Sequence, residues 1–296
     1  MLPSLRQRLI IGLAVAIGAA SWLLVAAALR AADGSTGLSI ATASVGPAAA
    51  ALIMLVAAVP AVIGGLIVAG TGNPLSGVFA VAAALCVVAI WGGSIDEWII
   101  RDGASAPGIY GWLIVEVGVW EAALVVVLIL MKTVPEHLRR PLTALISDDH
   151  LNADVAPRRI TVKSAAAAAI CASIGTVLSI FLLRSTESGQ VIWALILAFL
   201  IGGLAAHLIV PEGDCWAILL SPGLVAVVAY TWVLLSFDDK TPFLAAWYGV
   251  GRTATAVPGP ALALPIHYAS AALIGCTLGV GWAQGLNAAR MRVVEA

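Results

Sequence analysis

The stretch YGWLIVEVGVWEAALVVVLILM (residues 110–131) decides the fold class of this chain. It contains 22 residues, of which only Glu116 and Glu121 are charged. About 20 apolar residues in a helix cross the ~30 Å hydrocarbon core of a bilayer, at a rise of 1.5 Å per residue. The stretch is therefore predicted to be a membrane-spanning helix that carries two carboxyl groups at bilayer depth.

The rest of the chain has the same character. Of its 296 residues, 61% are hydrophobic and 10% are charged, and the mean hydropathy is +1.05. Soluble domains are about half apolar and about a quarter charged, so we predict an all-α, polytopic integral membrane helix bundle in contact with the lipid bilayer. The net charge of −1 gives no indication of a nucleic-acid partner. Eight apolar runs are candidate spans: 9–29, 47–70, 74–92, 110–131, 164–183, 189–210, 215–236 and 262–285.

The first run has two interpretations. Basic residues precede it, and the sequence AAALRAADG that follows resembles a small-residue cleavage site. A signal peptide, however, has an apolar core of about 7–15 residues, and this run is longer. We therefore expect an uncleaved first span, with cleavage as the alternative.

Lysine and arginine set the orientation of short membrane loops. With eight spans, both termini and the loop 132–163 share one side, which holds 10 of the 15 cationic residues. We predict that this side is cytoplasmic and that the protein lies in the cell (inner) membrane. The 10 residues are Arg6, Arg8, Lys132, Arg139, Arg140, Arg158, Arg159, Lys163, Arg290 and Arg292.

The central loop divides the chain into a four-helix half (1–131), a cytoplasmic linker (132–163) and a second four-helix half (164–296). Short segments recur in matching places: IGGL at 63–66 and 201–204, and SIDE at 94–97 against SFDD at 236–239. Transporters are often built from such repeats. In a chain this rich in Gly, Ala, Leu and Val, chance matches are the alternative to a tandem duplication.

Three polar residues in the spans are candidates for a proton or cation site: Glu116, Glu121 and His267. Ionisable residues at bilayer depth are costly and usually face a protein interior or water. Glu121 is expected about 16 Å from the outer end of its helix, near the midplane. Glu116 and His267 each lie eight residues after the glycine of a Pro-Gly pair, so a duplication would align them and let them share a proton. The alternative is that these side chains are hydrogen-bonded and only hold helices together.

Two further features bear on transport. Pro60 and Pro222 lie inside predicted spans, where proline removes a backbone hydrogen bond and can break the helix. Asp96, Glu97, Asp238 and Asp239 follow the third and seventh spans on the predicted outer side. If the halves repeat, these four acids form an external acidic rim that concentrates cations above Glu116 and His267.

The sequence gives no support for a metal, a cofactor or a catalytic centre. Its cysteines, Cys86, Cys171, Cys215 and Cys276, lie in or beside apolar runs and form no CxxC pair, so we interpret them as packing residues. Known hydrolase, metalloprotease and nucleotide-binding motifs are missing from the sequence. An enzyme is therefore not favoured.

Two functions remain. The first is a transporter or channel for an ion, proton or small solute, which would use the intramembrane carboxylates and the proline breaks. The second is a structural or assembly subunit of a membrane complex with no chemistry of its own. Glycines of the last span support close helix packing, either inside the monomer or in a homo-oligomer or complex; they are Gly275, Gly279, Gly281 and Gly285.

Overall fold

The computed structural model describes residues 5–30, 39–40, 43–71, 73–101, 107–133, 161–211, 214–249 and 257–295. Most of the predicted linker 132–163 therefore lies outside the described residues. The described part is built from helices and turns, without a strand. This confirms the predicted all-α membrane helix bundle.

The first half contains α1 (Leu5–Leu29), α2 (Pro47–Gly70), α3 (Pro74–Ile90), the short α4 (Ile95–Arg101) and α5 (Ile109–Thr133). The second half begins with α7 (Val162–Leu182), α8 (Ser188–Ile209), α9 (Cys215–Leu219), α10 (Ser221–Ser236) and the short α11 (Lys240–Trp247). Its last span is assembled from η1 (Gly259–Leu262), α12 (Pro265–His267), the π-helical turn η2 (Tyr268–Ala272) and α13 (Leu273–Glu295).

Among the described residues, seven helical segments are long and apolar enough to cross a membrane, with α9 and α10 together forming one of them. The predicted third span, α3, is an apolar helix of 17 residues, about 26 Å long. Each of the eight predicted runs thus lies on apolar helix. The chain is a multi-pass membrane protein, and the sidedness of its termini stays a prediction.

Local sequence explains where several helices begin. The Asn73 side chain accepts a hydrogen bond from the backbone N–H of Leu75 at 2.9 Å, and Pro74 occupies the first turn of α3. Thr161 and Ser164 form a reciprocal capping box at the start of α7. Such caps satisfy backbone donors that have no partner inside the helix.

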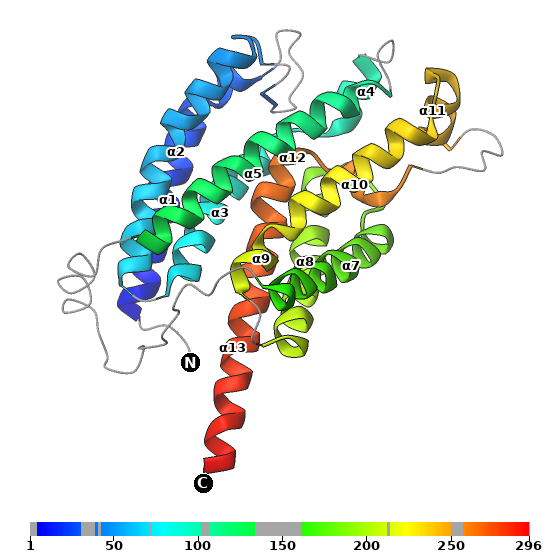
Figure 1. Cartoon of the computed structure of the whole chain (residues 1–296). Helices are drawn as coiled ribbons and strands as arrows, with labels where there is room; N and C mark the ends of the chain where they lie inside the picture. The colour runs from blue at the N-terminus through cyan, green and yellow to red at the C-terminus, as the bar shows by residue number, and fades with distance from the viewer. Residues whose placement is uncertain are drawn as a thin grey trace.

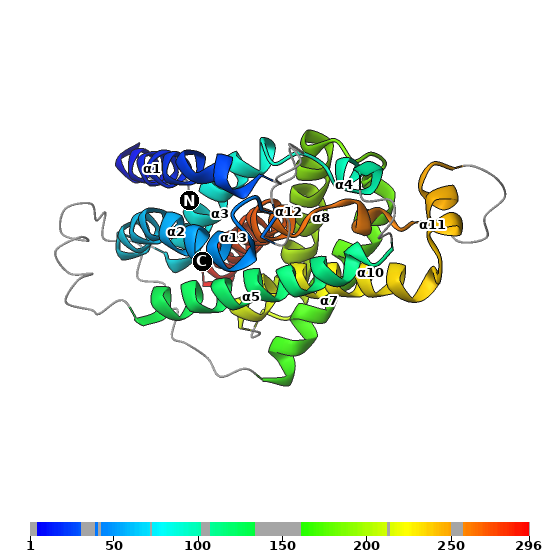
Figure 2. The same ribbon diagram turned by 90° about the horizontal axis from the view of Figure 1, so that it is seen from above.

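The two halves interlock through their third and fourth spans. Helices α1, α2 and α3 pack on one another, as do α7 and α8, while α5 lies along α10 and α3 contacts α13. Figure 1 shows α13 passing through the middle of the bundle, with its C-terminal part extending beyond it. The view from above in Figure 2 places α1, α2 and α3 on one side and α7 and α8 on the other.

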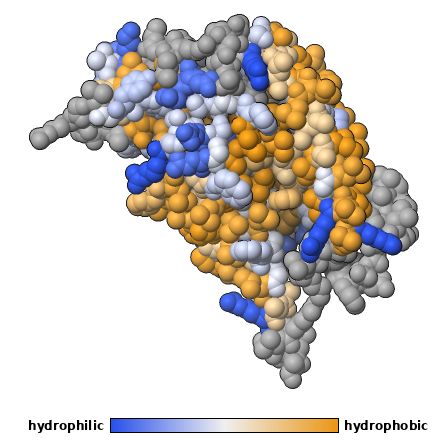
Figure 3. Space-filling view, turned by 180° about the vertical axis from the view of Figure 1, so that it is seen from behind, coloured by the Kyte–Doolittle hydropathy of each residue, from blue (hydrophilic) through white to orange (hydrophobic). Residues whose placement is uncertain are grey.

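The surface is apolar over a wide area (Figure 3). On α1, exposed side chains recur at three- to four-residue spacing and include Leu5, Leu9, Leu13 and Ile17. Exposed leucines of this spacing on a spanning helix face lipid. The core instead holds aromatic residues with almost no exposed surface: Tyr110, Tyr230, Tyr268, Phe199 and Phe243.

Both halves show the same order of elements, namely three spans, a short helix and a fourth span. The two short helices touch, since the Trp247 indole N–H donates to Asp96 Oδ1 at 2.7 Å. The tandem duplication itself remains a prediction. The third spans also differ, because α3 is continuous and its counterpart is divided into α9 and α10.

Candidate functional site at the interrupted seventh span

The interruption of the seventh span centres on Pro222. Helix α9 ends at Leu219 and α10 begins at Ser221, so Leu220 forms the junction. In a continuous helix the carbonyl of Ile218 would accept from the N–H of residue 222, which proline lacks. Two side chains donate to this carbonyl instead: Ser221 Oγ at 2.7 Å and Cys276 Sγ at 3.7 Å. Pro60, by contrast, lies inside α2, which is a continuous helix.

Glu121 reaches this junction from α5. Its carboxyl group lies so close to Gly223 that a Cβ built on the glycine would be 2.0 Å from Oε1. The Gly223 backbone N–H faces the carboxyl group. Gly223 stands in the first turn of α10, where backbone N–H groups and the helix dipole favour a negative charge. The glycine is therefore required for contact between the carboxyl group and the helix terminus.

Two cysteines meet beside the junction. Cys171 Sγ on α7 lies 3.8 Å from Cys276 Sγ on α13, and both side chains are fully buried. All four cysteines are buried, as expected of packing residues. The sequence did not reveal that two of them meet, because they are 105 residues apart in the chain and are brought together only by helix packing. All four cysteines are free, and the described residues contain no group of three or more His, Cys, Asp or Glu side chains placed to hold a metal.

Glu116 lies elsewhere, in the N-terminal third of α5, and is 3% exposed. Its Oε2 accepts from the hydroxyl of Ser39 and from the backbone N–H of Ile40 at 3.2 Å. Its Oε1 accepts from the Trp120 indole N–H at 3.4 Å. These bonds hold Ser39 and Ile40, which lie between α1 and α2, against α5. They match the alternative interpretation of Glu116, namely a hydrogen-bonded carboxyl group that holds parts of the structure together.

His267 is 1% exposed and ends the short helix α12. Its Nδ1 accepts from the backbone N–H of Leu264 at 3.1 Å. Its Nε2 lies near the Ala89 carbonyl but makes no hydrogen bond with any described residue. Neither ring nitrogen is hydrogen-bonded to Glu116, so the geometry does not provide the proton-sharing pair that the alignment suggested.

The predicted rim acids have different environments. Asp96 binds Trp247, as described above, and Glu97 is partly buried in the same short helix. Asp239 caps α11 by accepting from the Lys240 N–H at 2.7 Å, and Asp238 is exposed. Asp96 and Asp239 therefore both have structural roles. A common rim above the membrane site stays a prediction.

Three tyrosines that were not singled out from the sequence hold the segment before α12, which contains the 3-10 helix η1, by hydrogen bonds to its carbonyl groups. Tyr110 donates to the Ala261 carbonyl at 3.1 Å, Tyr268 donates to Pro260 at 2.7 Å, and Tyr230 donates to Ala263. Irregular backbone at membrane depth is tolerated where protein buries and satisfies it. No local pattern marks these tyrosines, since two of the bonds cross between helices distant in sequence.

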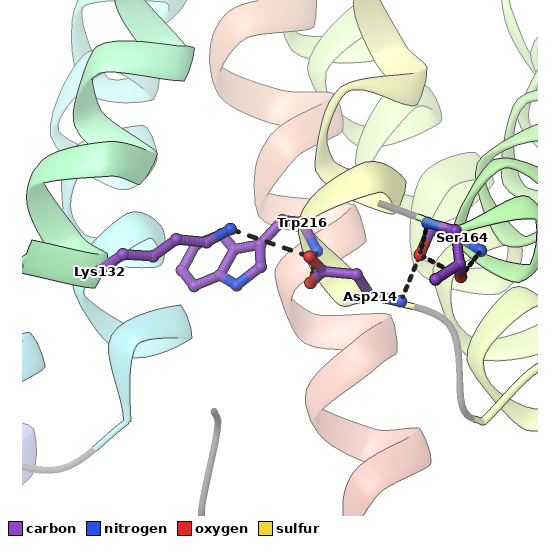
Figure 4. Close-up of polar contacts among 5 residues, drawn as sticks. Lys132, Ser164, Asp214 and Trp216 are labelled. Atoms are coloured by element: carbon purple, nitrogen blue, oxygen red, sulfur yellow. Dashed lines mark hydrogen bonds and ion pairs between the residues drawn. The ribbon is translucent and has the colours of Figure 1, made fainter. Parts of the chain in front are cut away.

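A second cluster missed from the sequence joins the halves at the opposite end of the bundle (Figure 4). Lys132 Nζ on α5 lies 3.8 Å from Asp214 Oδ2 and 5.0 Å from the centre of the Trp216 ring. Asp214 caps α9 by accepting from the Trp216 N–H at 3.1 Å, and its own N–H donates to Ser164 Oγ of α7 at 3.0 Å. Figure 4 shows these side chains in a row from α5 across α9 to α7. An aspartate directly before an apolar run was the available signal.

Of the predicted site residues, Glu121 and Pro222 lie at the same junction, because Glu121 contacts Gly223 directly after Pro222. Ser221 and the two thiols lie beside them. Comparison with protein-family models, with curated proteins and with solved structures found no match.

Proposed function

We propose that this multi-pass membrane protein is a transporter or channel for an ion, proton or small solute, and that Glu121 is its proton- or cation-binding group. The observation that carries the proposal is the contact of Glu121 with Gly223 in the first turn of α10, at an interrupted spanning helix. Interrupted helices whose ends face a polar group are a recurring design of transporter sites.

The energetics favour a switchable carboxyl group at this position. A charged side chain at the bilayer centre costs about 2.5–3.5 kcal/mol on insertion scales. A helix N-terminus stabilises an anion by about 0.3–1 kcal/mol, and by up to ~2 kcal/mol when the pair is partly buried. Because the two contributions are of similar size, modest changes in the surroundings can shift the carboxyl group between its charged and neutral forms.

The contact also joins the two halves, because Glu121 belongs to α5 and Gly223 belongs to α10. Loss of the negative charge removes the attraction to the α10 terminus. We infer that protonation or cation binding at Glu121 therefore changes how α5 packs on α10. In this proposal the protein lies in the cell membrane with both termini in the cytoplasm.

The test is flux through purified protein in vesicles, with fluorescent reporters for protons, Na⁺ and K⁺. Glu121→Gln keeps the size of the side chain and removes its charge, so flux should fall to the level of protein-free vesicles while the melting temperature is retained. Glu187→Gln is the matched control, because Glu187 is exposed and its side chain makes no capping bond. Unchanged flux in Glu121→Gln, with a flux-active wild type, would contradict the proposal.

One observation favours the second candidate, an assembly subunit or homo-oligomer. Gly281 and Gly285 on α13 have open space around them, and the neighbouring Trp282 is 62% exposed. Small residues beside an exposed aromatic side chain suit close contact with another helix. Replacing both glycines with leucine should then lower the mass of the complex in mild detergent, whereas an unchanged mass speaks against an interface there.

A further inference from the structure

The first half contains a large cavity that the transport proposal does not use. It has a volume of about 380 Å³ and is lined mainly by α2, α3 and α5, with Ala269 of the π-helical turn η2 and Leu273 of α13 also in its wall. Its walls are apolar apart from the indoles of Trp22 and Trp120. They include Leu55, Ala58 and Val62 of α2 and Val119, Ala123 and Val126 of α5. We call this cavity the α2–α5 groove.

The groove opens toward the lipid. Leu55 is 61% exposed and Val126 is 55% exposed, and each belongs to a spanning helix. The α2 residues that line the groove run from Ala51 to Val62, and over these eleven steps the helix advances about 16 Å. This is roughly half of the ~30 Å hydrocarbon thickness. The groove thus has the length and the access required for one hydrocarbon tail from a single leaflet.

One end of the groove adjoins a small polar pocket. This pocket is lined by Glu116 and Ser39, and it shares Trp22, Met54 and Trp120 with the groove. Its volume is about 10 Å³, close to the minimum that holds one water molecule. The two indoles at the boundary lie 6.2 Å apart between ring centres. A polar group that enters the pocket must therefore be no larger than a hydroxyl group or a similar small group.

We infer that the α2–α5 groove binds a single-chain lipid with a small hydroxyl head, with the tail in the groove and the hydroxyl at Glu116 and Ser39. A phosphate or carboxylate head would meet the carboxyl group of Glu116, and a phospholipid head is too large for the pocket. A hydroxyl is neutral, and it can both donate and accept hydrogen bonds. The groove lies on a different face of α5 from Glu121, so this site is separate from the proposed transport site.

The probe is hexadecanol with a photoactivatable diazirine in its chain, added to the full-length protein in phosphatidylcholine nanodiscs. After irradiation, mass spectrometry should find the label on peptides of α2, α3 and α5. Unlabelled hexadecanol should displace it about tenfold better than hexadecane, since a tenfold preference corresponds to ~1.4 kcal/mol from the head group. Equal displacement by hexadecane, or even labelling of all lipid-facing helices, would overturn the proposal.

Two variants separate the groove from the general surface. Ala123→Trp fills the groove and should abolish specific labelling, and Val126→Trp serves the same purpose if Ala123→Trp does not fold. Ile201→Trp is the matched control, because Ile201 is 39% exposed on α8 and does not line the groove. Labelling that survives both groove variants in folded protein would also overturn the proposal.

Discussion

The second and fourth spans are packed closely in the second half of the molecule and are separated in the first. In the second half, α13 packs against α8 so tightly that a Cβ on Gly275 would lie 2.4 Å from the Ile196 carbonyl oxygen. In the first half, the α2–α5 groove occupies the corresponding position. If the two halves are a duplication, the shift of 151 residues that aligns Glu116 with His267 also aligns Gly275 with Leu124, which lines the groove, and Gly279 with Leu128. We propose on this alignment that glycine permits the close contact of α8 with α13, and that the larger leucine at position 124 holds α5 away from α2.

The largest expected effect on stability comes from placing a leucine in the close contact between α8 and α13, as at the matching position of α5. A Cβ on Gly279 would lie 2.3 Å from the Leu200 carbonyl oxygen, so Gly279→Leu must move backbone. Overpacking typically costs about 1–3 kcal/mol and can cost more, and we expect the upper end or beyond. The measurement is the free energy of unfolding in mild detergent. Gly118→Leu on α5 is the control, because nothing lies within 4 Å of a Cβ there; equal stability of the two variants would remove this explanation.

Substitutions in the Lys132–Asp214 cluster, which joins the two halves, should lower stability by less. Asp214→Ala removes both the cap of α9 and the ion pair, and losing a cap costs about 0.5–2 kcal/mol. Lys132→Met removes only the charge and keeps much of the packing on Trp216. We therefore expect Asp214→Ala to lower the melting temperature more than Lys132→Met does. The reverse order would show that the ion pair matters more than the cap.

The smallest effect on stability is expected for Pro222→Ala at the interrupted helix. The same substitution should have a large effect on flux. Pro222→Ala supplies the missing N–H to the Ile218 carbonyl, and should make the seventh span resemble the continuous α3. Stability should change by about 1 kcal/mol or less, because one exchanged hydrogen bond contributes about that much. Flux in vesicles should fall, whereas Pro60→Ala in the continuous α2 should leave it unchanged. Wild-type flux in Pro222→Ala would separate the interruption from the function.

Features that depend on local sequence could be predicted. The length of the apolar runs predicted the spans, and the polar stretch around Asp96 was correctly placed between α3 and α5. What could not be predicted is contact between distant segments. Cys171 meets Cys276, and Lys132 meets Asp214, only because helices from different parts of the chain pack together. The groove also depends on how two helices pack, since α2 and α5 stay apart whereas α8 and α13 are in close contact. The residue pattern of a single helix does not reveal such a difference.

Only part of the candidate site could be predicted, because its residues come from helices that are distant in the sequence. Burial depth and proline position singled out Glu121 and Pro222 one at a time. Their meeting at Gly223 required the packing of α5 on α10. Glu116 and His267 were equally prominent in the sequence, yet each makes hydrogen bonds that stabilise nearby backbone.

The central claim is that Glu121 and the first turn of α10 act as a unit in transport. Gly223→Ala tests it most directly, because the added Cβ would lie 2.0 Å from Oε1 and must displace a carboxyl group that remains titratable. Proton and cation flux should be measured for Gly223→Ala, Glu121→Gln and the double variant, with Gly118→Ala as the control. The account predicts that both single variants lose flux and that the double variant is no worse than either, since groups that act as a unit are not additive. Wild-type flux in folded Gly223→Ala, or a further loss in the double variant, would contradict it.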